Sequence, residues 1–192
     1  TQRDAFARVL AEYRASQLFN ADRPESWANL GNLDARLGEV TAAEGEFARA
    51  VRLQPQFVPA YMQLAELYRT SGREASADSV LRLGLERVPA NTDLQYQLGL
   101  SLIRQGRKAD ALPLLKAAAE SGNSHYAYVY GVALFDGGQS ALAVTTLRKA
   151  LAATPDDREL LYGLASIAAA AGQRDVALGA ARRLAALEPG NA

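Results

Sequence analysis

The chain has 192 residues, 49% of them hydrophobic and 22% charged, so it is long enough to bury a sizeable apolar interior. Lysine plus arginine equals aspartate plus glutamate at 21 each, so no net field draws the chain to nucleic acid or anionic lipid. Cysteine is absent, which excludes disulfides, thiolate ligands and covalent haem attachment within this sequence. No apolar run reaches the roughly 18 residues of a membrane span, so we expect no membrane insertion.

A period of about 34 residues organises the chain. One glycine recurs at intervals of 34, 34, 32 and 34 residues, at positions Gly38, Gly72, Gly106, Gly138 and Gly172. The prolines agree, since Pro55 and Pro89 are 34 residues apart, as are Pro155 and Pro189. A fixed period of this length is typical of a stacked repeat protein.

In chain order, residues 1–23 are predicted to be the second helix of a repeat whose first helix is missing. The chain also lacks an initiator Met, so we interpret it as a fragment of a longer protein. Five repeats follow in one continuous domain, at residues 24–57, 58–91, 92–123, 124–157 and 158–191. Each contains two helices, which gives about eleven helices and no strands.

Within each repeat the apolar positions have helical spacing. Positions four, seven and eleven form one stripe on the first helix, and positions twenty, twenty-four and twenty-seven form another on the second. Position eight is always glycine or alanine and position twenty always alanine, which lets the two helices approach closely. The third repeat is two residues short and lacks the usual proline, so we expect Gly122 to end its second helix.

The spaced set Trp27-x2-Leu30-Gly31, Ala43-x3-Phe47 and Pro55 resembles the tetratricopeptide repeat. The resemblance covers almost the whole chain. It implies an all-α, right-handed superhelical solenoid of antiparallel helix pairs that binds a protein or peptide and is not an enzyme. In this family the first helices line a concave groove, and positions two, five, nine, twelve and thirteen usually face it.

The fifth position carries tyrosine in three successive repeats, Tyr96, Tyr128 and Tyr162. Tyrosine combines a large contact area with a polar tip, so we predict a tyrosine-rich binding groove. The alternative is that these rings pack on neighbouring first helices and only stiffen the superhelix. The other residues predicted to line the groove are Asn32, Met62, Glu66, Arg69 and Arg104.

Catalytic and metal-binding patterns are weak. His125 is the only histidine, no His-x3-His or nucleophile-elbow pattern surrounds it, and we interpret it as a solvated residue at a helix start. The pair Asp156-Asp157 is expected to cap the following helix. The sequence predicts no catalytic residue, metal site or cofactor.

A narrower resemblance concerns the stretches NADRPESWANLG, FVPAYMQLAELYRTSGR and YAYVYGVAL. They look like the C-terminal repeat region of large bacterial proteins with an N-terminal multihaem c-type cytochrome. This resemblance implies a bacterial, periplasmic location and an alternative function as an assembly module that makes contacts through its ends. The first helix (Phe6, Val9, Leu10, Tyr13) and the last (Leu184) lack covering helices, so we also expect self-association there.

Overall fold

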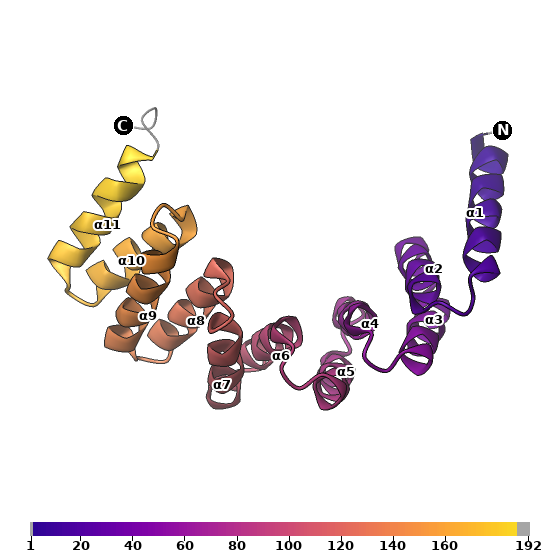
Figure 1. Ribbon diagram of the computed structural model, residues 1–192, viewed down its shortest axis with the longest axis horizontal. Helices are drawn as coiled ribbons and strands as arrows, with labels where there is room; N and C mark the ends of the chain where they lie inside the picture. Colours follow the sequence, from indigo (N-terminus) through magenta and orange to yellow (C-terminus); the bar gives the residue numbers. More distant parts are fainter. Residues whose placement is uncertain (1, 188–192) are drawn as a thin grey trace. The chain divides into compact units, whose positions relative to one another are not determined.

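The computed structural model describes residues 2–187, with side chains from residue 8 onward. Over that range the chain forms eleven α-helices and no strand, which confirms the predicted all-α class (Figure 1). In chain order the helices are α1 (Gln2–Phe19), α2 (Pro24–Leu37), α3 (Val40–Leu53), α4 (Val58–Thr70), α5 (Glu74–Arg87), α6 (Thr92–Arg104), α7 (Lys108–Ala119), α8 (Ser124–Asp136), α9 (Ser140–Ala153), α10 (Arg158–Ala170) and α11 (Arg174–Ala186).

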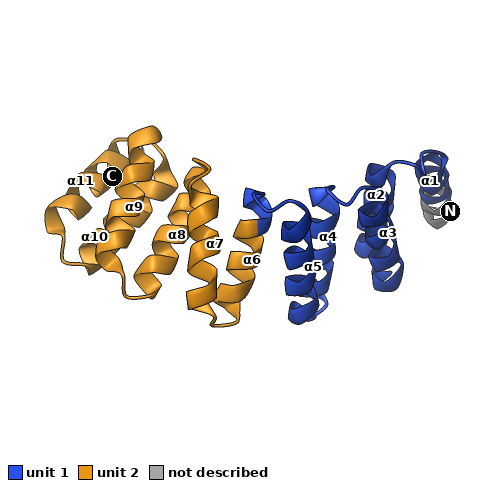
Figure 2. Cartoon of the chain, turned by 60° about the horizontal axis from the view of Figure 1, so that its bottom comes forward, with its two compact units in different colours: residues 1–94 blue, residues 95–192 orange. Residues whose placement is uncertain are grey.

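The chain consists of two compact units, unit 1 (residues 1–94) and unit 2 (residues 95–192), and the boundary lies near the start of α6 (Figure 2). In unit 1, α2 packs on α3 and α4 on α5. In unit 2, α8 packs on α9 and α10 on α11. Consecutive helices joined by short turns thus form the pairs expected of a tetratricopeptide solenoid.

The turn inside each pair depends on glycine. Gly38 has φ 82° and donates its N–H to the carbonyl of Ala35 at 3.2 Å. The next N–H, of Glu39, bonds to the carbonyl of Asp34 at 2.8 Å and completes the helix end. Gly122, after α7, has φ 86°, which confirms its predicted role as a helix terminator.

The close approach of paired helices depends on a second set of glycines. A β-carbon on Gly31 would lie 2.5 Å from the Phe47 ring, and one on Gly99 would lie 2.7 Å from Leu115. The side chain that fills the space over position eight therefore comes from position twenty-four. The alanine at position twenty, such as Ala43, is fully buried beside it.

Candidate binding surface

The three predicted groove tyrosines lie on the first helices α6, α8 and α10 of unit 2 and differ in exposure. Tyr96 is 8% exposed, Tyr128 is half-buried, and Tyr162 is 60% exposed. A β-carbon on Gly163 would lie 2.7 Å from the Tyr128 ring, so that ring packs closely on α10. Tyr96 and Tyr128 therefore make packing contacts within unit 2, and Tyr162 presents most of its ring to solvent.

A row of hydrogen bonds runs from α6 through α8 to α10. The Tyr96 hydroxyl lies 2.9 Å from His125 Nε2, and His125 Nδ1 lies 2.9 Å from a carboxylate oxygen of Glu159. Tyr126 stacks on Tyr96 with ring centroids 4.3 Å apart. His125 therefore joins two helices that flank its own.

Two groups at this row, Tyr96 and Asp157, have shifted pKa values. Burial and the nearby Glu159 charge raise the pKa of the Tyr96 phenol, so it stays neutral at pH 7 and is a poor nucleophile. Burial opposes ionisation of Asp157, but hydrogen bonds from Ser124 and from backbone N–H groups outweigh it and lower its pKa. The Asp157 carboxylate accepts the N–H of Leu160 at 2.9 Å, which confirms that it caps α10.

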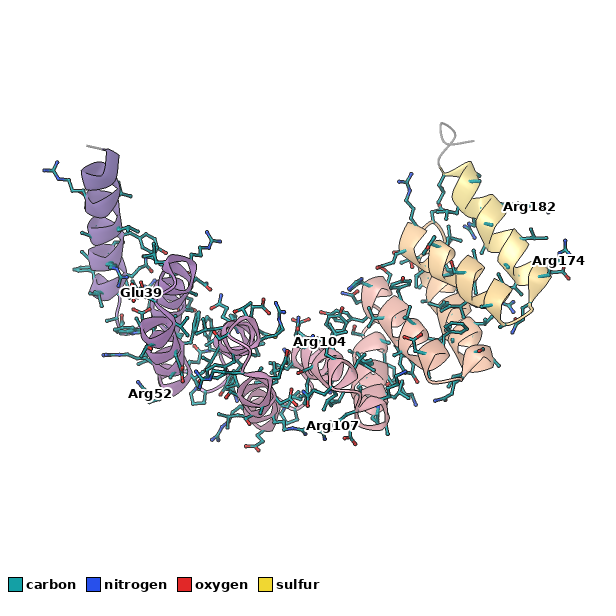
Figure 3. The ribbon with its side chains drawn as sticks, turned by 180° about the vertical axis from the view of Figure 1, so that it is seen from behind. Glu39, Arg52, Arg104, Arg107, Arg174 and Arg182 are labelled. Atoms are coloured by element: carbon teal, nitrogen blue, oxygen red, sulfur yellow. The ribbon has the colours of Figure 1, made fainter. Side chains whose placement is uncertain are left out.

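The other predicted residues are distributed over both units. In unit 1, Asn32 on α2 and Met62 on α4 are half-buried. Glu66 and Arg69 are exposed on α4 and pair with each other through two hydrogen bonds. In unit 2, Arg104 is exposed at the end of α6 (Figure 3).

Sequence reasoning missed the role of His125, which is a hydrogen-bonded link as well as a half-exposed side chain. The signal was present, because His125 and Glu159 are 34 residues apart, at position two of successive repeats. Residues one period apart in a stacked repeat lie on neighbouring first helices and can meet.

A second polar cluster, also missed, lies inside unit 1. Asp34 on α2 is fully buried at position eleven, where an apolar residue is usual, and pairs with Arg14 of α1. Burial and the Asp34 charge raise the pKa of Glu46 on α3 to about 7. Glu46 therefore keeps its proton up to about neutral pH, which avoids a second negative charge beside Asp34. This cluster attaches α1 to the first helix pair.

Over the described residues, no group of three or more His, Cys, Asp or Glu side chains is arranged to hold a metal ion. In the same part of the chain, no helix is both long and apolar enough to cross a membrane.

The sequence matches the tetratricopeptide repeat family over residues 28–92, 62–126, 96–158 and 131–192. The chain belongs to this family. Its members are in general non-catalytic modules for protein–protein interaction, and the chain has the helix-pair architecture of such a scaffold. No curated protein sequence matches the chain.

Several solved structures share the fold. YrrB, described as a tetratricopeptide protein with an unusual peptide-binding site, is 20% identical, with a TM-score of 0.67 and 93% of each chain covered. A MamA structure is 17% identical with a TM-score of 0.71, covering 86% of this chain and 92% of MamA. A second, MamA MSR-1, is 21% identical with a TM-score of 0.64, covering 88% and 98%. The narrower resemblance to multihaem cytochrome proteins gains no support from these matches.

Proposed function

We propose that the chain binds a peptide or protein along the face of α6, α8 and α10 that carries Tyr128, Tyr162 and the His125–Glu159 pair. The observation that carries the proposal is the 60% exposure of Tyr162, a large aromatic residue on a first helix. Aromatic side chains of this kind supply much of the energy of protein interfaces. His125 and Glu159, whose side chains are 50% and 40% exposed, add polar groups to the same face.

The packing of the three tyrosines supports different roles for them. Tyr96 is buried against His125 and Tyr126, so its role is to hold α6 on α8. Tyr128 contributes an edge to the surface, and Tyr162 contributes most of a ring. The other residues that the sequence predicts to line a groove, Asn32, Met62, Glu66, Arg69 and Arg104, stay predictions for their own helices.

Peptides selected from a random display library against the whole chain test the proposal. Tyr162→Ala should weaken binding of a selected peptide at least fivefold, about 1 kcal/mol, and should leave the unfolding temperature nearly unchanged. Leu178→Ala on α11 is the matched control, because Leu178 is 44% exposed but lies on a second helix. Equal binding by wild type and Tyr162→Ala, for every peptide selected, would overturn the proposal.

A second candidate function, an assembly module that self-associates through its ends, is favoured by the surface of α1. Val9 is 62% exposed, Leu18 52% and Phe19 90%. The Phe6 side chain, also predicted there, lies outside the described residues, and Leu184 on α11 is half-buried. Sedimentation velocity tests this function: association that is lost in Val9→Asp supports it, and a monomer at all concentrations contradicts it.

A further inference from the structure

A cavity of about 370 Å³ lies between the second helices α7 and α9 of unit 2, away from the tyrosine-bearing face. Ala127 and Tyr130 of α8 and Leu142 of α9 are among its lining residues, together with the turn that contains Gly122. Its size is in the range of sites that bind apolar side chains or small ligands.

The cavity lies beside a position that large side chains occupy in other repeats. Position four is Trp27 in the first repeat and Tyr61 in the second, but Ala127 in the fourth. The Trp27 indole N–H bonds to the carbonyl of Ala21 at 2.7 Å, and the Tyr61 hydroxyl bonds to the carbonyl of Pro55 at 2.8 Å. Each ring thus packs under the turn that precedes its own helix.

Ala127 is too short to make this contact. The turn before it also differs, because the third repeat is two residues short and has Gly122 in place of the usual proline region. The irregular period and the small residue therefore coincide at one place, where the structure has an open cavity.

Two lysines contribute positive charge to the lining of the cavity. Lys116 of α7 and Lys149 of α9 both line it, with Glu120 as the one acidic residue. Lys116 and Glu120 are 4.0 Å apart and more than 60% exposed, so this pair contributes little stability. Among the described residues Lys149 has no ion-pair partner.

A similar hollow one repeat later provides an internal comparison. It measures about 390 Å³ and lies between α9 and α11, with Arg148 on its wall. There position four is Leu161, which is 2% exposed and lines the hollow, whereas Ala127 lines the cavity beside the turn that contains Gly122. Arg148 and Lys149 are adjacent on α9, yet they line different hollows.

We propose that the cavity between α7 and α9 is a second protein-binding site, which accepts one aromatic side chain of a partner's acidic segment. The ring occupies the space that Trp27 and Tyr61 fill in their own repeats. Carboxylates flanking that ring meet the ammonium groups of Lys149 and Lys116. The site does not depend on the tyrosine-bearing face, because its contacts come from α7, α9 and the buried side of α8.

The test is a titration of the whole chain with a peptide in which one tryptophan is flanked by two glutamates on each side. The peptide should shift the backbone amide signals of residues 116–130 and 142–154 in ¹H–¹⁵N spectra. A peptide with lysines in place of the glutamates should bind several-fold more weakly, because it places like charges beside Lys149.

Three variants locate the site. Ala127→Trp should fill the cavity and weaken binding roughly tenfold or more, a difference of about 1.4 kcal/mol. Lys149→Glu should weaken binding about two- to fivefold, the range of an exposed ion pair, while the matched Arg148→Glu should leave it unchanged. If Ala127→Trp does not fold, as judged by circular dichroism, Ala127→Tyr provides the smaller ring, the one that Tyr61 supplies in the second repeat.

No detectable binding at millimolar peptide, equal binding of the lysine peptide, or full binding by the filled variant would each overturn the proposal. Tyr162→Ala should not affect this peptide. Failure of this site and failure of the tyrosine-bearing face are therefore separate results.

Discussion

Unit 1 and unit 2 have the same helix-pair architecture but differ in the residue at position four and in where their polar groups lie. In unit 1, Trp27 and Tyr61 occupy position four and bond to the preceding turns. In unit 2 that position is Leu161 in the last repeat but only Ala127 in the one before, where a cavity adjoins it. Both arrangements keep the close crossing of paired helices, because Gly31 in unit 1 and Gly99 and Gly131 in unit 2 each face a large side chain from position twenty-four.

The two units also differ in the burial of their polar groups. Unit 1 buries Asp34 completely, pairs it with Arg14 and keeps the neighbouring Glu46 in its neutral form. Unit 2 keeps His125 and Glu159 partly exposed on its first helices. Filled space stabilises a fold and a buried carboxylate has to be paired, whereas open space and exposed polar groups are available to a partner. The cavity and the exposed Tyr162 therefore place both argued binding sites in unit 2.

Among the variants that test this comparison, Tyr61→Ala should have the largest effect on stability. Tyr61 is 1% exposed, so truncation should leave a cavity and lower the free energy of unfolding by about 3–5 kcal/mol. Urea unfolding followed by circular dichroism measures the loss. The control Tyr61→Phe removes only the hydrogen bond to Pro55 and should cost about 1 kcal/mol. A loss below 1 kcal/mol for Tyr61→Ala would mean that position four is not what stabilises unit 1.

The pH dependence of stability tests the buried charge. The Glu46 pKa is about 7 in the folded chain and 4.5 in the reference state, so between these values the folded state holds a proton that the unfolded state has released. The stabilisation is complete below pH 4.5 and is lost as pH rises through 7. Glu46→Gln should remove this dependence, a difference of up to about 3 kcal/mol.

Glu44, on the same helix, is a control because its pKa is shifted in the opposite direction from that of Glu46. Hydrogen bonds from Arg73 and Tyr68 lower the pKa of Glu44, so its contribution is present above pH 4.5 and is lost as pH falls. Glu44→Gln should therefore flatten the acid side of the stability profile, and Glu46→Gln the neutral side. Identical profiles for wild type and Glu46→Gln would show that the pKa of Glu46 is not raised in the folded chain.

The fold could be predicted from the sequence because its determinants recur. The glycine after each first helix and the alanine at position twenty repeat with the period, so one repeat predicts the next. The candidate sites depend on departures from the period, such as Asp34 in an apolar position and Ala127 in place of a ring. A departure shows that packing changes but does not show which distant side chain responds. Arg14 is 20 residues from Asp34, on a different helix, and only the structure shows that they pair.

The smallest expected effect concerns the exposed polar row of unit 2. His125→Ala removes the link between Tyr96 and Glu159, but the His125 and Glu159 side chains are 50% and 40% exposed, so water can replace it. The loss of stability should be at most about 1 kcal/mol, as for other exposed ion pairs. Tyr96 should keep its place, because Tyr126 still stacks on it at 4.3 Å.

A double-mutant cycle of His125→Ala with Tyr96→Phe separates this link from the packing of the ring. A coupling energy within about 1 kcal/mol is expected. A coupling energy above roughly 2 kcal/mol would show that the hydrogen-bonded row of unit 2 is coupled as strongly as a buried polar network. The two units would then not differ in this respect. A weak link has a consequence for binding, since His125 and Glu159 can then turn toward a partner's polar groups at little cost to the fold. Tyr162, on the same helix face as Glu159, supplies the apolar contact beside them.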